Sequence, residues 1–250
     1  MHRGEFQDCF SAGAEGYARY RQTYPPHLYE ALAALAPGRA RCWDCATGSG
    51  QAAIGLAACF DEVIATDASA EQLARARPHP RVTYRQALAE QSGLPDGSVD
   101  MVTVAAGIHW FDLERFYDEV RRVARPGAVL AAWSYGAHLR VGPTIDPIIE
   151  RFVEHVGPHW PERFRHIRTE YRELPFPFEE LALPAFSITM RWTVDDLVGN
   201  MRTWSGVQAM ARETGTDPTA TVRAELADAW GAEPSRPCEW PLFFRVGRVS

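Results

Sequence analysis

A short apolar stretch runs directly into a glycine-containing loop near the start of the chain, and this succession constrains the fold more than any other feature. Asp44 closes a run that fits a buried strand, Gly48 and Gly50 permit a tight turn, and residues 51–59 continue as an Ala-rich helix. The first N–H groups of such a helix are unpaired, so the turn attracts an anionic ligand. The pattern predicts a nucleotide-type binding loop.

A second acidic residue, Asp67, ends the next predicted strand, residues 63–67. A carboxylate about 20 residues after the glycine loop is typical of a group that accepts hydrogen bonds from ribose hydroxyls. Ser69 and Gln72 form a capping box at the start of a predicted helix, residues 70–76. Because Ser69 caps that helix, we expect Asp67 to remain available to a ligand.

Strands and helices alternate through the first half of the chain. Further strands are expected at residues 82–87, 100–106 and 128–133, and the helical spacing of apolar residues predicts a helix at 113–124. This alternation predicts a mostly parallel sheet covered by helices, in which ligands bind at the carboxyl ends of the strands.

The alternation breaks after residue 135, although 250 residues fit one α/β domain with an insertion. The expected elements are a helix at 144–156, an aromatic and Pro-rich stretch at 158–184, a strand at 186–192, helices at 194–204 and 219–230, and a last strand at 242–249. We therefore expect a single domain made of an N-terminal lid (1–40), a cofactor-binding core (41–135), a substrate-cap insertion (136–185), and C-terminal strands and helices that complete the sheet (186–250).

The chain contains no lysine, so all 26 basic residues are arginines. A P-loop nucleotidase needs the lysine of its phosphate loop, and a pyridoxal phosphate enzyme needs the lysine of its Schiff base. A short-chain dehydrogenase would resemble its family in carrying a Tyr-xxx-Lys pair, which this chain cannot form because it has no lysine. The composition excludes all three classes.

The five cysteines are an odd set for a disulfide framework, and we expect reduced thiols. Cys42 and Cys45 form a CxxC pair, which invites a redox or zinc interpretation. A separation of three residues places their side chains on opposite faces of a strand, so no metal site is predicted.

The net charge of −6, without a polybasic block, disfavours nucleic acid or an anionic membrane as the main partner. No apolar run approaches the roughly 20 residues of a membrane span, and residues 1–9 lack the order of a signal peptide. We expect a cytoplasmic protein that acts on a small molecule. The oligomeric state is left open.

Several motifs together resemble the class I S-adenosylmethionine-dependent methyltransferases, over nearly the whole chain. DCATGSGQAA is similar to the acid-and-glycine loop of that family, VIATDAS to its ribose-binding strand end, LPDGSVDMV to the approach to its fourth strand, and VRRVARPGAVLAAW to the helix, turn and strand that follow. YARYRQTYP, AAGIHWFD and TWSGVQ resemble the trans-aconitate and small-acid group. The resemblance implies a Rossmann-like three-layer sandwich with a seven-stranded, mostly parallel sheet, an antiparallel last strand, and an insertion after the fifth strand.

The resemblance also implies S-adenosylmethionine as the cofactor. Asp44 would hold the loop or accept from the cofactor's amino group, Gly48 and Gly50 would make room for the methionine part, and Asp67 would bind the ribose. Ala46 replaces the first glycine of the family pattern, with less backbone freedom. The other cofactor-binding candidates are Tyr17 and Arg21, which would close over the methionine carboxylate, Ala68, Ala89 with its backbone N–H near the adenine, Glu90 and Ala105.

His109 follows the fourth predicted strand, where the methyl group and the acceptor meet in that family. A carboxylate acceptor is already ionised and needs no general base, so His109 would then orient or desolvate it. For a phenol or hydroxyl acceptor it would be the candidate base. The substrate-binding candidates are Tyr20, Trp110, Tyr135 and Trp204, and further aromatic candidates are Trp160, Phe164, Tyr171, Phe176 and Phe178. Arg163, Arg165 and Arg168 are candidates to bind a substrate carboxylate.

Two other interpretations remain open at this point. The spacing of Gly48, Gly50 and Ala53 also fits a dinucleotide fingerprint, which would indicate an NAD-linked oxidoreductase. Ala46 supports a non-catalytic protein that binds the cofactor or a regulatory partner on the same fold.

Overall fold

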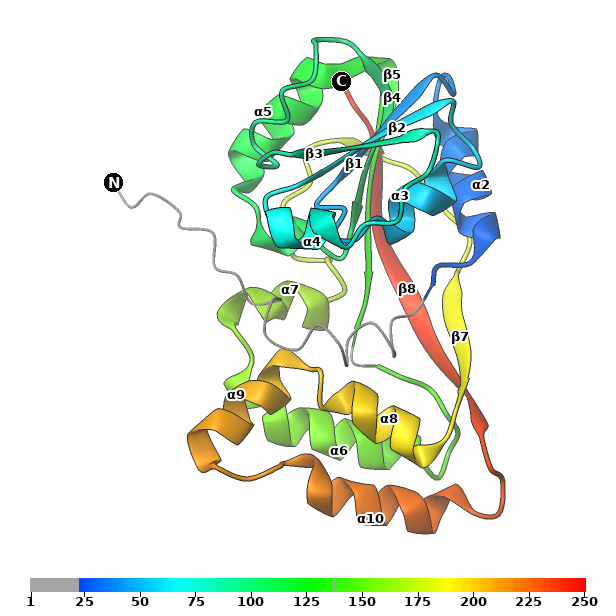
Figure 1. Ribbon diagram of the computed structural model, residues 1–250, viewed down its shortest axis with the longest axis vertical. Helices are drawn as coiled ribbons and strands as arrows, with labels where there is room; N and C mark the ends of the chain where they lie inside the picture. The colour runs from blue at the N-terminus through cyan, green and yellow to red at the C-terminus, as the bar shows by residue number, and fades with distance from the viewer. Residues whose placement is uncertain (1–22, 137) are drawn as a thin grey trace.

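The computed structural model of the protein describes residues 23–136 and 138–250 and is organised around an eight-stranded sheet (Figure 1). Seven strands follow one another in the order β3-β2-β1-β4-β5-β8-β6, and β7 pairs with β8 outside this path. The first five are parallel, whereas β8 is antiparallel to β5. The strands are β1 Arg41–Cys45, β2 Glu62–Asp67, β3 Val82–Gln86, β4 Val99–Ala105, β5 Ala124–Tyr135, β6 Glu179–Glu180, β7 Ser187–Trp192 and β8 Arg236–Arg248. The predicted Rossmann-like sheet is confirmed; β7 matches the strand predicted at 186–192, whereas the short strand β6 was not predicted.

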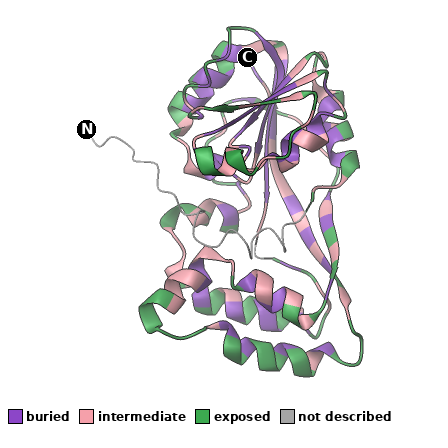
Figure 2. Ribbon diagram, viewed as in Figure 1, coloured by how far each residue is buried: buried purple, intermediate pink, exposed green. Residues whose placement is uncertain are grey.

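Helices cover both faces of the parallel strands and make the sandwich three layers thick (Figure 1). Helices α2, Pro26–Leu35, and α3, Gln51–Leu56, share one buried core with Cys42, Val63 and Met101. Helix α5, Leu113–Val123, lies on the other face of the sheet. It shares the second core with the residue that follows each of these three in its strand. Successive side chains of a strand point to opposite faces, so strands buried on both sides read as continuous apolar runs. Figure 2 shows these central strands as mostly buried.

Local sequence signals set the ends of several helices. Helix α4, Ala70–Ala74, begins where the Ser69 hydroxyl accepts a hydrogen bond from the Gln72 N–H at 3.3 Å, as the predicted cap requires. Asp112 caps α5 in the same way. Helix α2 starts with a proline at its first position, where no N–H is needed.

Strand β8 is longer than predicted and connects two parts of the molecule. Its residues 242–248 pair with β5, whereas residues 236–241 pair with β7. Pro237 and Pro241 hid the first half of this strand, because proline rarely occurs inside a sheet. The N–H of Glu239 points to the carbonyl of Arg140 and that of Leu242 to the carbonyl of Phe186, before β7. Since N–H groups alternate along a strand, both prolines face away from β7 and interrupt no hydrogen bond with it.

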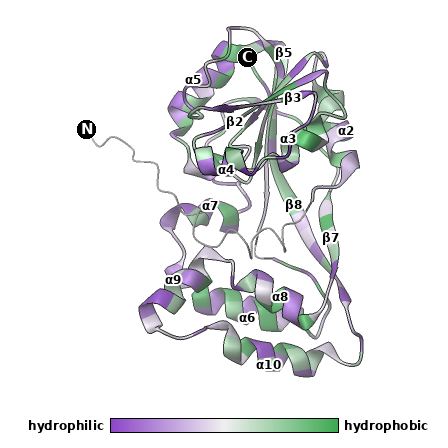
Figure 3. Cartoon of the chain, in the orientation of Figure 1, coloured by the Kyte–Doolittle hydropathy of each residue, from purple (hydrophilic) through white to green (hydrophobic). Residues whose placement is uncertain are grey.

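A helical part lies below the sheet in Figure 1 and is built from two separate stretches of sequence. It comprises α6 Asp146–Val156, α8 Val194–Met201, α9 Ser205–Thr214 and α10 Thr219–Trp230. Helices α9 and α10 pack with α6, and α8 packs with α10, so residues 194–230 lie in the same part of the molecule as α6. Their apolar sides meet inside the bundle while polar sides face out (Figure 3). Helix α9 was not predicted, because its sequence is largely polar and has no side-chain cap.

A short segment joins the two parts. It contains the 3-10 turns Gly157–His159 and Glu162–Phe164 and the one-turn helix α7, Arg165–Arg168. Within the described residues, no helix has both the length and the apolar character that crossing a membrane requires.

Candidate active site at the carboxyl ends of the parallel strands

The strand order reverses between β1 and β4, which are neighbours at the centre of the sheet. Open α/β sheets bind ligands at this reversal, beyond the carboxyl ends of the strands. The loop from Ala46 to Gly50 follows β1, and His109 lies in a 3-10 turn, Ile108–Trp110, just after β4. The structure thereby brings together the two segments that the sequence analysis singled out.

The glycine loop has an unusual backbone in which every second residue is left-handed. The φ angles are +54° at Ala46, +59° at Gly48 and +84° at Gly50. The N–H of Thr47 donates to the carbonyl of Thr66 on β2 at 2.9 Å, and Gly50 precedes α3 as its N-cap. The loop therefore holds the open end of α3 at the carboxyl edge of the sheet, as predicted.

Asp44 is fully buried beneath this loop and fastens it. Its carboxylate accepts hydrogen bonds from the hydroxyls of Thr47, at 2.5 Å, and Thr103, at 2.8 Å. Burial raises the pKa of Asp44 to about 6, against the opposing effect of these two hydrogen bonds. Of the two roles considered for Asp44, the structure shows the first, which is to hold the loop. Thr47 and Thr103 were not predicted, although a threonine three residues after the acid was a visible signal.

Asp67 sits at the end of β2 and faces the same loop. One carboxylate oxygen accepts from the N–H of Gly48 at 2.8 Å, and the other accepts from the N–H of Ser69 at 2.8 Å. The sequence analysis expected Asp67 to be left to a ligand, but it also ties the loop to β2. A carboxylate can accept several hydrogen bonds at once, so this role is compatible with binding of ligand hydroxyls.

Ala46 fits its left-handed conformation because the neighbouring strand end makes room for it. A Cβ atom at Gly107 would lie only 2.9 Å from the Cβ of Ala46. Ala106, beside Gly107, is also left-handed, with φ of +58°. Such conformations in non-glycine residues cost about 1–2 kcal/mol each and cluster at functional sites. Gly107 was not predicted as a site residue, because its contact with Ala46 joins the ends of two different strands, β4 and β1.

The remaining cofactor candidates lie along the same edge of the sheet. Ala105 ends β4, Ala68 follows β2, and its carbonyl accepts from the Gln86 side chain at 2.9 Å. Ala89 is buried, and the Glu90 carboxylate accepts from the N–H of Asp112 at 2.9 Å, which ties this segment to the start of α5. Tyr17, Tyr20 and Arg21 lie outside the described residues.

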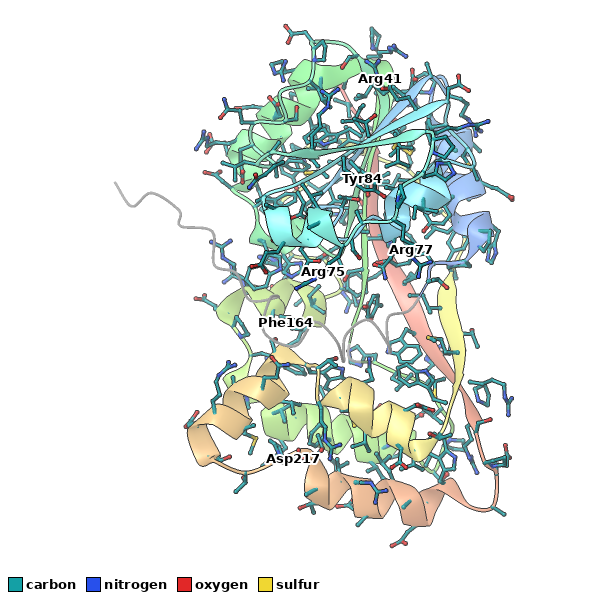
Figure 4. The ribbon with its side chains drawn as sticks, in the orientation of Figure 1. Arg41, Arg75, Arg77, Tyr84, Phe164 and Asp217 are labelled. Carbon is teal, nitrogen blue, oxygen red and sulfur yellow. The ribbon has the colours of Figure 1, made fainter. Side chains whose placement is uncertain are left out.

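Tyr84 was not predicted and lies directly over the glycine loop. A Cβ atom at Gly50 would clash with the Tyr84 hydroxyl, which donates to the carbonyl of Arg77 at 3.0 Å. Figure 4 labels Tyr84 and Arg77, on β3 and on the segment before it. Gly50 is therefore required both by its φ angle and by the close approach of this ring.

His109 is buried among aromatic rings at the end of β4. Its Nδ1 lies 3.1 Å from the Tyr171 hydroxyl, and its ring neighbours are those of Trp110, Phe164 and Tyr171. Burial, together with smaller contributions from His166 and Arg163, lowers the pKa of His109 to about 3. The imidazole is neutral at physiological pH and is a weak base.

A row of aromatic side chains leads from His109 towards the helical part. Phe164, labelled in Figure 4 between the two parts, stacks on Trp160 with ring centroids 5.4 Å apart. The next ring in the row is that of Trp204, whose centroid lies 6.3 Å from that of Trp160. Trp204 thus joins the row, whereas Tyr135 ends β5 and is half-buried there. Tyr117 packs edge-on against the two remaining aromatic candidates, Phe176 and Phe178, on the α5 side.

The arginines proposed to bind a substrate carboxylate are exposed. Arg163 donates to the backbone carbonyl of Trp110 at 2.5 Å, and Arg165 pairs with Glu162 at 3.3 Å. Arg168 is also exposed, on α7. Two of the three arginines thus bind groups of the chain itself.

The CxxC pair behaves as predicted. Cys42 belongs to the core on the α2 and α3 side, and Cys45 to the core on the α5 side, so the two thiols lie on opposite faces of β1. Burial raises the pKa of both. Across residues 23–136 and 138–250, no cluster of three or more His, Cys, Asp or Glu side chains is arranged to hold a metal ion.

The fold and the site define a protein that binds a nucleotide-type cofactor at the reversal point of a parallel sheet. Residues 43–132 match the family model described as a methyltransferase domain. A methyltransferase of Dictyostelium discoideum is 31% identical over 231 residues, which cover 90% of this chain and 88% of that protein. The chain belongs to the methyltransferase family, and its cofactor is S-adenosylmethionine.

Solved structures and partial matches agree with this assignment. The structure of a type II methyltransferase from Anaeromyxobacter dehalogenans has a TM-score of 0.86 and 46% identity, over 92% of this chain and 98% of that one. An uncharacterised methyltransferase of Mycobacterium tuberculosis is 37% identical, but the match spans only 52% of its length. The NAD-linked and non-catalytic interpretations are therefore wrong.

The described residues fit S-adenosylmethionine in the chemistry of their groups. A buried carboxylate, Asp67, meets the ribose-binding requirement at the end of β2, and the left-handed backbone at Gly48 exposes the loop to close approach. Asp44 adds a second buried carboxylate beneath the loop.

Proposed function

We propose that this enzyme transfers the methyl group of S-adenosylmethionine to a carboxylate oxygen of a small organic acid. The observation that carries the proposal is the state of His109, which is buried, neutral and weakly basic at the strand end where the acceptor would lie. A base with a pKa of about 3 removes a proton from a phenol or an alcohol inefficiently at neutral pH. A carboxylate needs no such step, because it ionises near pH 4.

The cofactor supplies an electrophilic methyl carbon on a sulfonium. Asp67, which accepts from the N–H groups of Gly48 and Ser69, would also bind the ribose, and Asp44 would keep the loop in place. Ala68, Ala89, Glu90 and Ala105 would line the same edge of the sheet. Tyr17 and Arg21 are proposed to close over the methionine carboxylate.

The described residues near the acceptor would position it and exclude water. His109 and Trp110 would contact the acceptor, with Tyr135, Trp204 and Tyr20 as further substrate-binding residues. Apolar rings around a carboxylate strip its hydration, which strengthens it as a nucleophile. With the cofactor bound, these residues would align the acceptor oxygen with its methyl carbon, so that the C–O bond would form as the C–S bond breaks and no proton would move. Such alignment can lower a barrier by about 7–11 kcal/mol in favourable cases.

Transfer of a labelled methyl group tests this function. The purified protein is given labelled S-adenosylmethionine with a panel of mono-, di- and tricarboxylic acids, and with phenols and amines of similar size. We expect label in the acids, as esters that mild alkali hydrolyses. Label confined to phenols or amines would refute carboxylate methylation.

A matched pair of variants on β2 controls for cofactor binding. Asp67→Ala removes the group that accepts from the N–H groups of Gly48 and Ser69 and that would bind the ribose. We expect the affinity for S-adenosylmethionine to fall by about 100-fold, since hydrogen bonds to a charged group contribute about 1.5–3 kcal/mol. Glu62→Ala, on the same strand but paired with Arg41 at its far end, should leave the affinity unchanged in calorimetry.

A further inference from the structure

Tyr171 connects His109 to the rest of the fold. Its side chain is completely buried, and its hydroxyl lies 3.1 Å from His109 Nδ1 although the two residues are 62 positions apart. Burial raises the pKa of Tyr171, so the hydroxyl keeps its proton and can donate it to an acceptor.

The surroundings of the Tyr171 hydroxyl indicate the direction of this hydrogen bond. Within the described residues, Nδ1 of His109 lies within hydrogen-bond distance of the hydroxyl. A buried O–H that lacks an acceptor is costly. Tyr171 therefore donates to Nδ1 of His109.

We propose that this hydrogen bond from Tyr171 holds His109 in the tautomer with its proton on Nε2, which makes Tyr171 a positioning residue. A neutral imidazole carries one proton, and the bond made by one nitrogen decides which nitrogen bears it. The inference rests on the proposed function, because His109 then offers the acceptor an N–H donor rather than a base. A carboxylate has a second oxygen to accept that bond while the first attacks.

The backbone around Tyr171 supports a role beyond packing. Glu170 and Tyr171 are successive left-handed residues, with φ of +51° and +59°, which non-glycine residues rarely adopt. The Arg245 guanidinium, from β8, donates to the carbonyls of Tyr171 at 3.0 Å and Leu174 at 3.1 Å. The Tyr171 ring also packs edge-on against Phe243 of β8. An uncommon turn held from a distant strand is typical of a functional position.

The test compares two buried tyrosines whose hydroxyls have different partners. Tyr171→Phe removes the bond to His109, whereas Tyr117→Phe removes a buried hydroxyl that donates to the carbonyl of Pro175. Nitrogen-15 spectra of the imidazoles report the tautomer of each histidine, and His109→Gln identifies the signals of His109. We expect the Nε2–H tautomer in the unmodified protein, a mixture of tautomers in Tyr171→Phe, and no change in Tyr117→Phe.

Activity and binding complete the test. We expect Tyr171→Phe to lower kcat about tenfold with any accepted acid, while affinity for S-adenosylmethionine stays within about twofold. An Nδ1–H tautomer in the unmodified protein, or an unchanged tautomer in Tyr171→Phe, would overturn the inference. If Tyr171→Phe does not fold, the spectrum of the unmodified protein decides by itself, because an Nδ1–H tautomer of His109 there overturns the inference.

The outcome separates this inference from the proposed function. Spectra need no methyl acceptor, so the predicted tautomer without methylation of any acid would refute the carboxylate proposal and keep the hydrogen bond from Tyr171 to His109. Methylated acids with the opposite tautomer would refute the role of Tyr171 alone.

Discussion

The sheet and the helical part of this enzyme are held together in different ways. At the carboxyl ends of the strands, buried carboxylates accept hydrogen bonds from N–H and hydroxyl groups over distances of 2.5–2.8 Å. In the helical part, apolar side chains fill the interior, and ion pairs such as Arg223–Asp195 lie at the surface. Buried polar groups tolerate little displacement because an unpaired group is costly, whereas apolar packing tolerates exchange of side chains.

This contrast indicates a division of labour. The cofactor side is built from polar groups with fixed partners, which suits a ligand that is the same in every turnover. The proposed acceptor side, between His109 and Trp204, is lined by aromatic rings, whose replacement changes the shape of the site more than its charge. We infer that substitutions near the glycine loop act on stability and cofactor binding, and that substitutions in the aromatic row act on the choice of acceptor.

The largest expected effect concerns Asp44. Its folded-state pKa of about 6 lies above the value near 3.9 of an unfolded chain, so the folded protein binds this proton more tightly. The resulting stabilisation is complete below about pH 4 and is lost as the pH rises through 6. In Asp44→Asn the amide stays neutral, so the variant should gain on the order of 3 kcal/mol relative to the unmodified protein between pH 4 and pH 7.

Urea unfolding at a series of pH values measures this difference. Asp61→Asn, at an exposed site before β2, is the control and should track the unmodified protein at every pH. A difference for Asp44→Asn that does not vary with pH would show that the buried carboxylate has no raised pKa.

An intermediate effect is expected where two strand ends touch. Gly107→Ala would place a Cβ atom 2.9 Å from that of Ala46, and overpacking of this kind costs about 1–3 kcal/mol. Ala46→Gly removes the opposing atom and the left-handed strain together. The double variant should therefore recover most of the stability lost by Gly107→Ala, as measured in a double-mutant cycle by urea unfolding. Simple additivity of the two changes would contradict the contact.

The smallest effect is expected in the helical part. Arg223 of α10 pairs with Asp195 of α8 at 2.7 Å, and both side chains are more than half exposed. Exposed pairs contribute about 0.2–1 kcal/mol and are screened by salt. We expect Arg223→Gln to lower the free energy of unfolding by less than about 1 kcal/mol, with no difference in 1 M salt. A loss above 2 kcal/mol would show that polar contacts also hold this part together.

Most of the fold was predictable because its signals are local. The strand before the glycine loop, the Ser69 cap and the amphipathic face of α5 all depend on neighbours within a few residues, and each element was found in the expected place. The first half of β8 was missed because two prolines are compatible with a strand only when their positions face away from its partner. The way in which α6, α8, α9 and α10 pack together depends on which apolar faces meet. Periodicity alone does not reveal these contacts.

The amino-acid sequence by itself determined the α/β class, the glycine loop with Asp44 and Asp67, and a cofactor chemistry that needs no lysine, because these depend on residue type and short spacing. Only the tertiary structure decided that Gly107 makes room for Ala46 and that Tyr171 reaches His109. Asp67 likewise proved to hold the loop as well as face a ligand. These contacts join residues far apart in the chain, and their geometry is set by strand register and packing, for which the order of residues carries no local signal.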